Sequence, residues 1–241
     1  MNQTWSKADL HIHTTHSDGA ASVEEVLEYV ATRTDLRVIA ITDHDTIEGA
    51  LEARRLAPSY GLEVIVGEEI STNEGHLLAL FVERLVAPRQ SVAATVAQVH
   101  AQGGLCIAAH PYDWVVPSLG RFDLGRRCAG AQPEWPLDAI EAFNASLWLP
   151  SNNRRAGSTA QALGLAAIGG SDSHHLPTIG SGHTLFPGTT AQDVYNAIRA
   201  GTTRAAGRHW LVDQQLVVVG RFFKRVARQV AGRALRPLAA R

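Results

Sequence analysis

Short apolar segments alternate along the chain with longer segments in which hydrophobic residues recur at helical spacing. The apolar segments have the length of buried strands, and they lie at 9–13, 36–42, 63–66, 76–82, 105–109, 138–143 and 165–168, with a last short one at 203–206. The helical pattern occupies 22–33, 47–57, 91–102, 151–163 and 190–200. This alternation indicates βα units and a parallel sheet.

Several predicted helices carry their own start and stop signals. Ser22 and Glu25 fit a capping box, in which each side chain bonds the other residue's backbone N–H. Ser91 and Thr190 are suited to cap the third and fifth helices. With about seven βα units in 241 residues, closure of the sheet into a TIM-like barrel is the natural arrangement.

The segment 112–136 interrupts the pattern with several Pro and Gly residues, and we expect it to form an added loop or cap. The barrel is expected to occupy residues 1–212. Residues 213–241 combine apolar positions with basic ones, and we expect a basic amphipathic C-terminal helix docked on the barrel. A membrane surface or a nucleic-acid backbone are alternative partners for such a helix.

Composition narrows the class of protein. The chain is 45% hydrophobic and 19% charged, with a net charge of −1, which is ordinary for a globular domain. Its 21 C-terminal residues hold six Arg, one Lys and no acid. We find no transmembrane-length apolar run, no secretory leader and no Cys-x-x-Cys pair around the two cysteines, so a cytoplasmic location is expected.

The candidate chemistry begins at residues 8–19, A-D-L-H-I-H-T-T-H-S-D-G. Residues two apart on a strand point to the same face, so His11 and His13 are expected to lie side by side, with Asp18 nearby. Imidazole and carboxylate groups together are typical metal ligands.

Other polar residues follow the predicted strands, at the end where α/β barrels carry their sites: His44, Glu69, His110, Asn144, Asp172 and His174. His76 is an exception because it begins its strand. Any one of these histidines alone is more simply an ordinary core or surface residue. Burying so many charges without a metal would cost several kcal/mol each, so the set as a whole indicates a metal centre.

Six motifs in a fixed order carry a resemblance to a known family: D-L-H-I-H-T-T-H-S-D-G, I-T-D-H-D-T, G-E-E-I-S, H-L-L-A-L, A-H-P and G-S-D-S-H. Residues 8–210 thereby resemble the PHP (polymerase and histidinol phosphatase) family of metal-dependent phosphoesterases. The resemblance implies a distorted (β/α)7 barrel with two or three divalent metal ions.

The resemblance also implies a ligand set. The first metal would be held by His11, His13, Glu69 and Asp172. Glu69 would bridge to a second metal held with His76 and His110. The third would be held by Asp18, His44 and His174.

Several acids and histidines lie next to the predicted ligands without belonging to the ligand set. Glu68 faces away from Glu69 on a strand, and the family pattern selects Glu69. Asp9 and Asp45 either orient ligands or have a structural role. His16, His175 and His183 stay unassigned, and Cys106 is interpreted as a small core residue rather than a nucleophile.

Amidohydrolase barrels also begin with His-x-His, and their binuclear members commonly use a carboxylated lysine as the bridge. The chain has two lysines, Lys7 and Lys224, and neither follows a mid-barrel strand. Glu69 fills the bridging position instead, which favours the phosphoesterase.

We therefore expect hydrolysis of a phosphate ester of a small metabolite, nucleotide or short oligonucleotide by a metal-bridging hydroxide. Glu69, Asp172 and His174 would act through that hydroxide. Mixed ligation admits Mn, Fe or Zn. A 5′–3′ exonuclease on short RNA or DNA and a non-catalytic PHP barrel used for binding or regulation are the alternatives.

Arginine and tryptophan residues are the candidates for substrate contacts. The guanidinium fork matches two phosphate oxygens. The candidates are Arg121, Arg126, Arg127, Arg154 and Arg155, together with Asn144; surface solvation explains each arginine equally well. Trp114 and Trp135 are suited to stack a base or sugar, or to pack the cap.

Overall fold

The computed structural model describes residues 4–217 and 220. The chain divides into two compact units, Met1–His209 and Trp210–Arg241. In the second unit, residues 212–217 and 220 are helical, and the rest of the predicted basic helix lies outside the described residues. Within the described part of the chain, no helix has the length and apolar character needed to cross a membrane.

The first unit is an α/β domain. Its strands are β1 (Trp5–Asp9), β2 (Val38–Ile41), β3 (Glu63–Ser71), β4 (His76–Leu80), β5 (Leu105–Ala108), β6 (Ala139–Asn144), β7 (Ala166–Gly170), β8 (Gly182–Pro187) and β9 (Arg204–Gly207). Its helices are α1 (Val23–Arg33), α2 (Glu48–Leu56), α3 (Val92–His100), α4 (Leu124–Arg127), α5 (Pro150–Leu163) and α6 (Ala191–Arg199). Short 3-10 helices are η1 (Ala57–Tyr60), η2 (Leu119–Phe122) and η3 (Leu176–Thr178). The predicted cap therefore contains η2 and α4.

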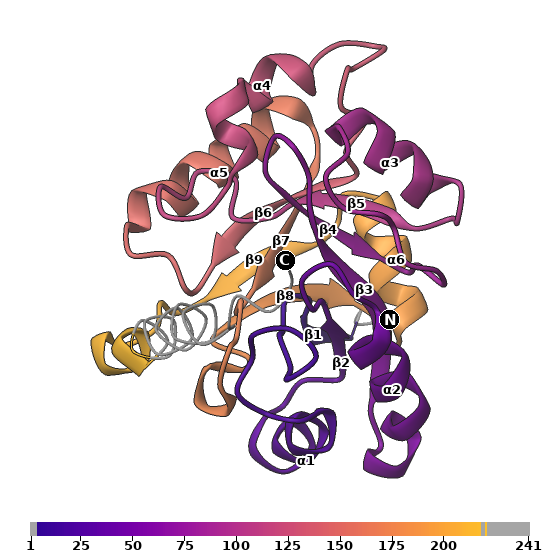
Figure 1. Ribbon diagram of the computed structural model, residues 1–241, viewed down its shortest axis with the longest axis vertical. Coiled ribbons are helices and arrows are strands. Elements are labelled where there is room, and N and C mark those ends of the chain that lie inside the picture. The colour runs from indigo at the N-terminus through magenta and orange to yellow at the C-terminus, as the bar shows by residue number, and fades with distance from the viewer. Residues whose placement is uncertain (1–3, 218–219, 221–241) are drawn as a thin grey trace, which may run out of the picture. The chain divides into compact units, whose positions relative to one another are not determined.

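The strands of the described residues form one sheet in the order β7-β6-β5-β4-β3-β2-β1-β8-β9, which curls into a nearly closed barrel with helices outside it (Figure 1). The predicted TIM-like α/β barrel is confirmed. The sheet is mixed rather than parallel, however, because β4 is antiparallel to both neighbours and β8 is antiparallel to β1 and β9.

The direction of β4 follows from the length of its connection. Residues 72–75 alone join β3 to β4, whereas a parallel crossover needs a dozen or more residues. The two strands therefore form a hairpin in which Ser71 pairs with His76. This reversal brings His76, the first residue of β4, to the barrel end where β3 finishes.

The strand β8 was not predicted, because it lacks a continuous apolar run and buries only alternate residues. It helps to close the barrel. The Thr184 hydroxyl accepts a hydrogen bond from the Gly169 N–H on β7 at 2.9 Å and donates one to the Gly169 carbonyl at 2.8 Å. Gly182 packs directly against the backbone of Gly170.

Two strand boundaries also differ from prediction. β1 ends at Asp9, so His11 and His13 follow the strand rather than lying within it. They flank Ile12, which makes a single parallel bridge with Ser173 and keeps the segment extended. β3 continues to Ser71, so Glu69 lies inside a strand.

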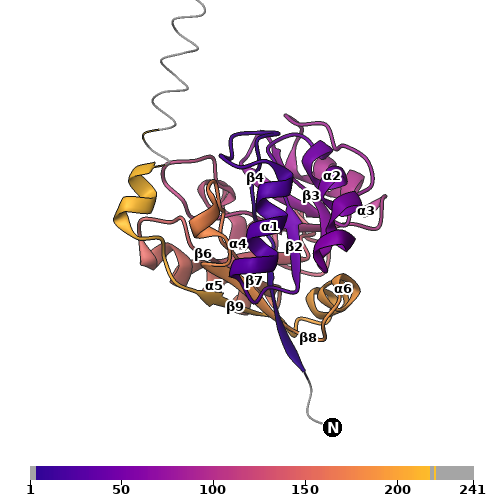
Figure 2. The same ribbon diagram turned by 90° about the horizontal axis from the view of Figure 1, so that it is seen from below.

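Apolar residues pack on both faces of the sheet, which explains the nearly continuous hydrophobic strands. Ile39 and Ile41 of β2 point outward to a core shared with α1, α2, α3 and α5, which lie outside the sheet (Figures 1 and 2). Val38 and Ala40 point inward to a second core that includes residues of α6.

Helix α6 lies at the end of the barrel where the strands begin. The Ala191 N–H at its start donates to the Glu63 carboxylate at the start of β3, at 2.7 Å. Arg199 at its end pairs with Asp138, just before β6, at 2.9 Å. The opposite end of the barrel is therefore the one left for chemistry.

We expect Gly182→Ala to destabilise the barrel, because a Cβ there would lie 2.0 Å from the Gly170 oxygen. The loss should be about 1–3 kcal/mol, measured as a lower urea midpoint at unchanged slope. Gly157→Ala in α5 is the matched control, since no heavy atom lies within 4 Å of its Cβ position; it should gain about 0.5–1 kcal/mol. Equal shifts in the two variants would contradict this account of closure.

Candidate metal centre

The predicted ligands come from separate strands and meet at one end of the barrel. Most of them follow parallel strands, and His76 joins them because β4 runs the other way. The loop after β1 contributes His11, His13 and Asp18, while the loop after β7 contributes Asp172 and His174. The Ile12–Ser173 bridge holds these two loops together.

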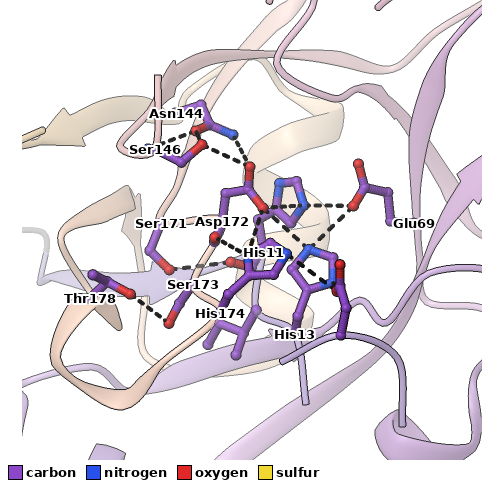
Figure 3. Close-up of polar contacts among 12 residues, drawn as sticks. His11, His13, Glu69, Asn144, Ser146, Ser171, Asp172, Ser173, His174 and Thr178 are labelled. Carbon is purple, nitrogen blue, oxygen red and sulfur yellow. Dashed lines mark hydrogen bonds and ion pairs between the residues drawn. The ribbon is translucent and has the colours of Figure 1, made fainter. Parts of the chain in front are cut away.

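A buried group at the centre contains His11, His13, Glu69 and Asp172, whose candidate ligand atoms all lie within 4.8 Å of one another (Figure 3). The Nε2 atoms of both histidines lie 3.2 Å from Glu69 Oε2. They lie 3.4 Å and 3.2 Å from Asp172 Oδ1. These four residues are the set predicted for the first metal.

The second carboxylate oxygen of Glu69 faces a different pair of imidazoles. Glu69 Oε1 lies 2.9 Å from His76 Nδ1 and 2.8 Å from His110 Nε2. His44 also approaches Glu69, with its Nδ1 3.3 Å from Oε2, and His44, Glu69 and His76 form a second group with clustered ligand atoms. One carboxylate therefore stands between two sets of donors.

A third group is more exposed. Asp18 Oδ1 lies 3.3 Å from His174 Nε2 and 4.0 Å from His44 Nε2. His13 belongs to this group as well, in addition to the three predicted residues. The side chains of Asp18 and His44 are each 29% exposed, against 1% for Glu69, so this group forms the solvent side of the centre.

The donor set fits divalent cations. His13 Nδ1, His13 Nε2 and His110 Nδ1 are buried and have no hydrogen-bond partner among the described residues. A buried polar atom without a partner is costly. The His13 Nε2 atom faces two carboxylates at 3.2 Å without hydrogen-bond geometry, an arrangement that a shared cation would satisfy.

The charges of the cluster support one another. Burial by itself lowers the pKa of His11, but the carboxylates of Asp172, Glu141 and Glu69 raise that pKa well above its ordinary value. Burial also opposes the charged form of His13, yet Asp172 and Glu69 raise its pKa to about 10. Such positions favour positive charge, whether it is supplied by protons or by metal ions.

The carboxylates respond in the opposite sense. Burial by itself raises the pKa of Glu69, but His44, His11 and His76 hold that pKa well below its ordinary value. The pKa of Asp172 is lowered in the same way, because His11 and His13 outweigh the effect of burial. Both groups are therefore ionised donors near neutral pH.

Glu141 is a part of the centre that the sequence analysis missed. It is fully buried on β6, and its Oε1 lies 3.0 Å from His11 Nδ1. Its Oε2 accepts hydrogen bonds from the His110 N–H at 2.7 Å and from the Asn144 amide at 3.0 Å. A carboxylate behind a ligating imidazole fixes its orientation. The sequence feature that could have identified Glu141 is its place as an acidic residue in the middle of the apolar segment 138–143.

Asn144 has partners inside the protein rather than a free amide. Its Nδ2 donates to Glu141 and, at 3.2 Å, to Asp172. The Ser146 hydroxyl lies 2.7 Å from Asn144 Oδ1 and 2.9 Å from Asp172 Oδ2, so both oxygens share its single proton (Figure 3). Asn144 thus links Glu141 to Asp172, and its contact with substrate stays a prediction.

Three other acids near the predicted ligands hold backbone N–H groups. Asp9 accepts from the N–H groups of Ser171 at 3.0 Å and Gly180 at 2.8 Å, and burial raises its pKa to about 6. Asp45 accepts from the Ser71 N–H at 2.7 Å. Glu68 faces away from Glu69 as predicted, and accepts from the Val86 N–H at 3.1 Å.

The unassigned histidines make contacts away from the donor groups. His16 Nε2 pairs with Glu52 on α2 at 2.8 Å. His183 Nδ1 lies 3.1 Å from the Gly180 carbonyl. His175 Nδ1 lies 3.4 Å from the Thr178 hydroxyl.

Two cluster residues have a backbone conformation that L-residues rarely adopt. The φ angles are 28° at His110 and 54° at Asp172. Surrounding contacts hold both of them, since the His110 carbonyl accepts from the Asp113 N–H at 3.0 Å and from the Ser118 hydroxyl at 3.1 Å. Strain of this kind persists where surrounding structure over-determines it, and it is common at functional sites.

The predicted arginines lie on the cap and on α5. Arg126 pairs with Asp123 at 3.0 Å, and both side chains are more than 60% exposed. Arg127 pairs with Glu134 and lies over the Trp135 ring at 4.7 Å. Trp135 is buried, so it packs the cap instead of offering a face to substrate. Arg154 is exposed on α5.

The comparisons with known proteins agree with this geometry. The PHP domain family matches residues 9–133, and a PHP-associated family matches residues 150–203. The chain belongs to the PHP family. Its predicted enzyme class, a hydrolase of phosphoric ester bonds, is thereby confirmed at the level of the family.

The uncharacterized protein MJ1587 of Methanocaldococcus jannaschii is 38% identical over 152 residues, which are 58% of this chain and 82% of that protein. A two-domain protein from Bacteroides vulgatus, described as containing a predicted PHP-like metal-dependent phosphoesterase, shares the fold. Its TM-score is 0.67 at 21% identity, and the match covers 86% of this chain and 66% of the other.

Two enzymes match shorter segments. A phosphoribosyl 1,2-cyclic phosphate 1,2-diphosphodiesterase from Eggerthella lenta is 42% identical over 31% of this chain and 30% of its own length. A 5′-3′ exoribonuclease from Haemophilus influenzae is 48% identical over 28% of this chain and 24% of its own length. The chain thus matches less than a third of either enzyme.

We expect Glu141→Gln to weaken metal binding by roughly 10- to 100-fold, as loss of a carboxylate behind a ligating histidine does. Competition with a coloured chelator measures the dissociation constant. Glu52→Gln is the matched control, because Glu52 also faces an imidazole but lies outside the donor groups. Equal affinities in the two variants would remove Glu141 from the centre.

Proposed function

We propose that this protein hydrolyses a phosphate ester of a small metabolite, a nucleotide or a short oligonucleotide at a centre of two or three divalent cations. The position of Glu69 carries the proposal. Its Oε1 faces His76 and His110 while its Oε2 faces His11, His13 and His44. A carboxylate shared in this way is suited to bridge two cations, the arrangement that phosphatases and nucleases use.

Divalent cations in such a site supply a nucleophilic water of lowered pKa and neutralise charge on the phosphoryl oxygens. The residues of the chain provide the frame for that chemistry. Glu69 and Asp172 are ionised and buried, and Glu141 and Asn144 fix their surroundings.

The direction of substrate entry follows from burial. His11 and Glu69 are inaccessible, while Asp18, His44 and His174 retain 16–29% exposure of their side chains. We infer that the phosphate approaches from the side of this third group. His174 is held there by its Nδ1, 2.9 Å from the Asp172 carbonyl.

The unpartnered ring nitrogens and the relatives also bear on the two alternative functions. Three buried histidine ring nitrogens have no hydrogen-bond partner among the described residues, which is costly unless they bind a ligand such as a metal ion. This observation disfavours a non-catalytic barrel. An exonuclease on short RNA or DNA is compatible with the site, and the similarity to an exoribonuclease supports it as a second candidate. Both activities require the same cations.

The choice of metals follows from donor chemistry. Mixed imidazole and carboxylate ligation suits Mn, Fe or Zn. A reducing cytoplasm is proposed because Cys106 and Cys128 are both buried free thiols.

The double variant His11→Ala, His13→Ala should lose phosphatase activity by more than the roughly 100-fold that an outer partner contributes. Phosphate release from nucleotides, sugar phosphates and short RNA, with Mn²⁺ added after chelator treatment, provides the measurement. Chelation should abolish the wild-type activity and Mn²⁺ should restore it.

His16→Ala is the control for that variant, because His16 pairs with Glu52 away from the donor groups. It should retain wild-type activity. Full activity in the double variant would refute a metal-dependent phosphoesterase at this site.

A further inference from the structure

A pocket outside the donor groups lies in the cap segment. It has a volume of about 310 Å³ and is lined by Pro111, Tyr112, Asp113, Trp114, Gly120, Arg121 and Arg155. This volume falls within the range of small-molecule sites. None of these residues belongs to the candidate ligand set.

The pocket adjoins the metal centre through the chain itself. Pro111 follows His110, whose Nε2 lies 2.8 Å from Glu69. The Pro117 carbonyl accepts from the His76 N–H at 3.3 Å. Gly75 packs so closely on the backbone of Ser118 that a Cβ there would lie 2.8 Å from it. The segment is therefore fastened to both histidines that face Glu69 Oε1.

One wall of the pocket is formed by the Arg155 guanidinium stacked on the Tyr112 ring. The Arg155 guanidinium carbon lies 4.0 Å from the centre of the Tyr112 ring. The Tyr112 hydroxyl is bonded to Thr159 at 2.8 Å, and Gly120 leaves no room for a side chain against the ring. No carboxylate of the described residues pairs with Arg155. Its N–H edge is therefore free to donate.

A second flat surface is Trp114, which is 75% exposed. Its backbone is fixed rather than loose. Arg121 donates to the Trp114 carbonyl at 2.6 Å, and the Asp113 carboxylate accepts from the Val115 N–H at 2.7 Å. The side chains of Arg121 and Asp113 thus fix the backbone around Trp114 while its indole stays exposed. Arg121 holds this backbone through one of its guanidinium nitrogens.

We propose that this pocket binds the nucleobase of a nucleotide whose phosphate lies at the metal centre. The inference rests on the proposed function, since it places one ligand across both sites. Indole and guanidinium faces stack on any base. The second carboxylate oxygen of Asp113 and the N–H edge of Arg155 supply an acceptor and a donor in the pocket lining, which a base edge requires.

The test compares AMP with ribose 5-phosphate, two ligands that differ by the base alone. Calorimetry on the full chain loaded with Mn²⁺ should show AMP binding about tenfold more tightly, the size of one stacking contact. Trp114→Ala and Arg155→Lys should each lower this preference severalfold, because the first removes the indole and the second removes the planar stack on Tyr112.

Phe122→Ala is the matched control. Phe122 is also an exposed aromatic residue of the cap, at 42%, but it does not line the pocket. This variant should keep the wild-type preference, and thermal melting of each variant checks that the cap remains folded.

Equal binding of AMP and ribose 5-phosphate would overturn the base pocket, as would equal losses in Trp114→Ala and Phe122→Ala. The binding assay stands apart from turnover. If no phosphate ester is hydrolysed while the preference for AMP depends on Trp114, the proposed function fails and the pocket stands. If esters are hydrolysed but AMP is not preferred over ribose 5-phosphate, the proposed function stands and the base pocket fails.

Discussion

The centre depends on one buried carboxylate, Glu69, placed among five imidazoles. A charge in this position is stable only if positive charge surrounds it on every side. The two oxygens of Glu69 face different sets of histidines. The arrangement therefore divides the site into separate groups of donors while keeping them in electrostatic contact.

Much of the barrel serves to hold those donors. The hairpin between β3 and β4 reverses a strand so that His76 reaches Glu69. Glu141 ties His11 to the backbone of His110, and Asn144 ties Glu141 to Asp172. Asp9 fixes the start of the loop after β7 by accepting a hydrogen bond from the Ser171 N–H. These contacts come from four strands, so no single element can move without disturbing the cluster.

The cap adds a second environment of different chemistry beside the first. The donor groups are polar and largely buried, whereas the pocket of Tyr112, Trp114 and Arg155 offers flat, exposed faces. Backbone contacts of Pro117 with His76 and of the Ser118 hydroxyl with the His110 carbonyl couple the two. A nucleotide likewise combines a charged phosphate, suited to the donor groups, with a flat base, suited to the pocket.

The sequence by itself determined the barrel class, because apolar strands alternating with amphipathic helices can bury both faces of a sheet in few other ways. It also indicated the candidate donor residues, since their types and order match the motifs of the PHP family. Tertiary structure alone decided the closure through β8 and the place of Glu141 behind His11, whereas the direction of β4 follows from its short connection to β3. The tertiary structure also showed that Asn144 bonds Glu141 and Asp172 and that Arg121 bonds the Trp114 carbonyl. Those features depend on which distant segments lie side by side, and local patterns of hydrophobicity carry no record of that.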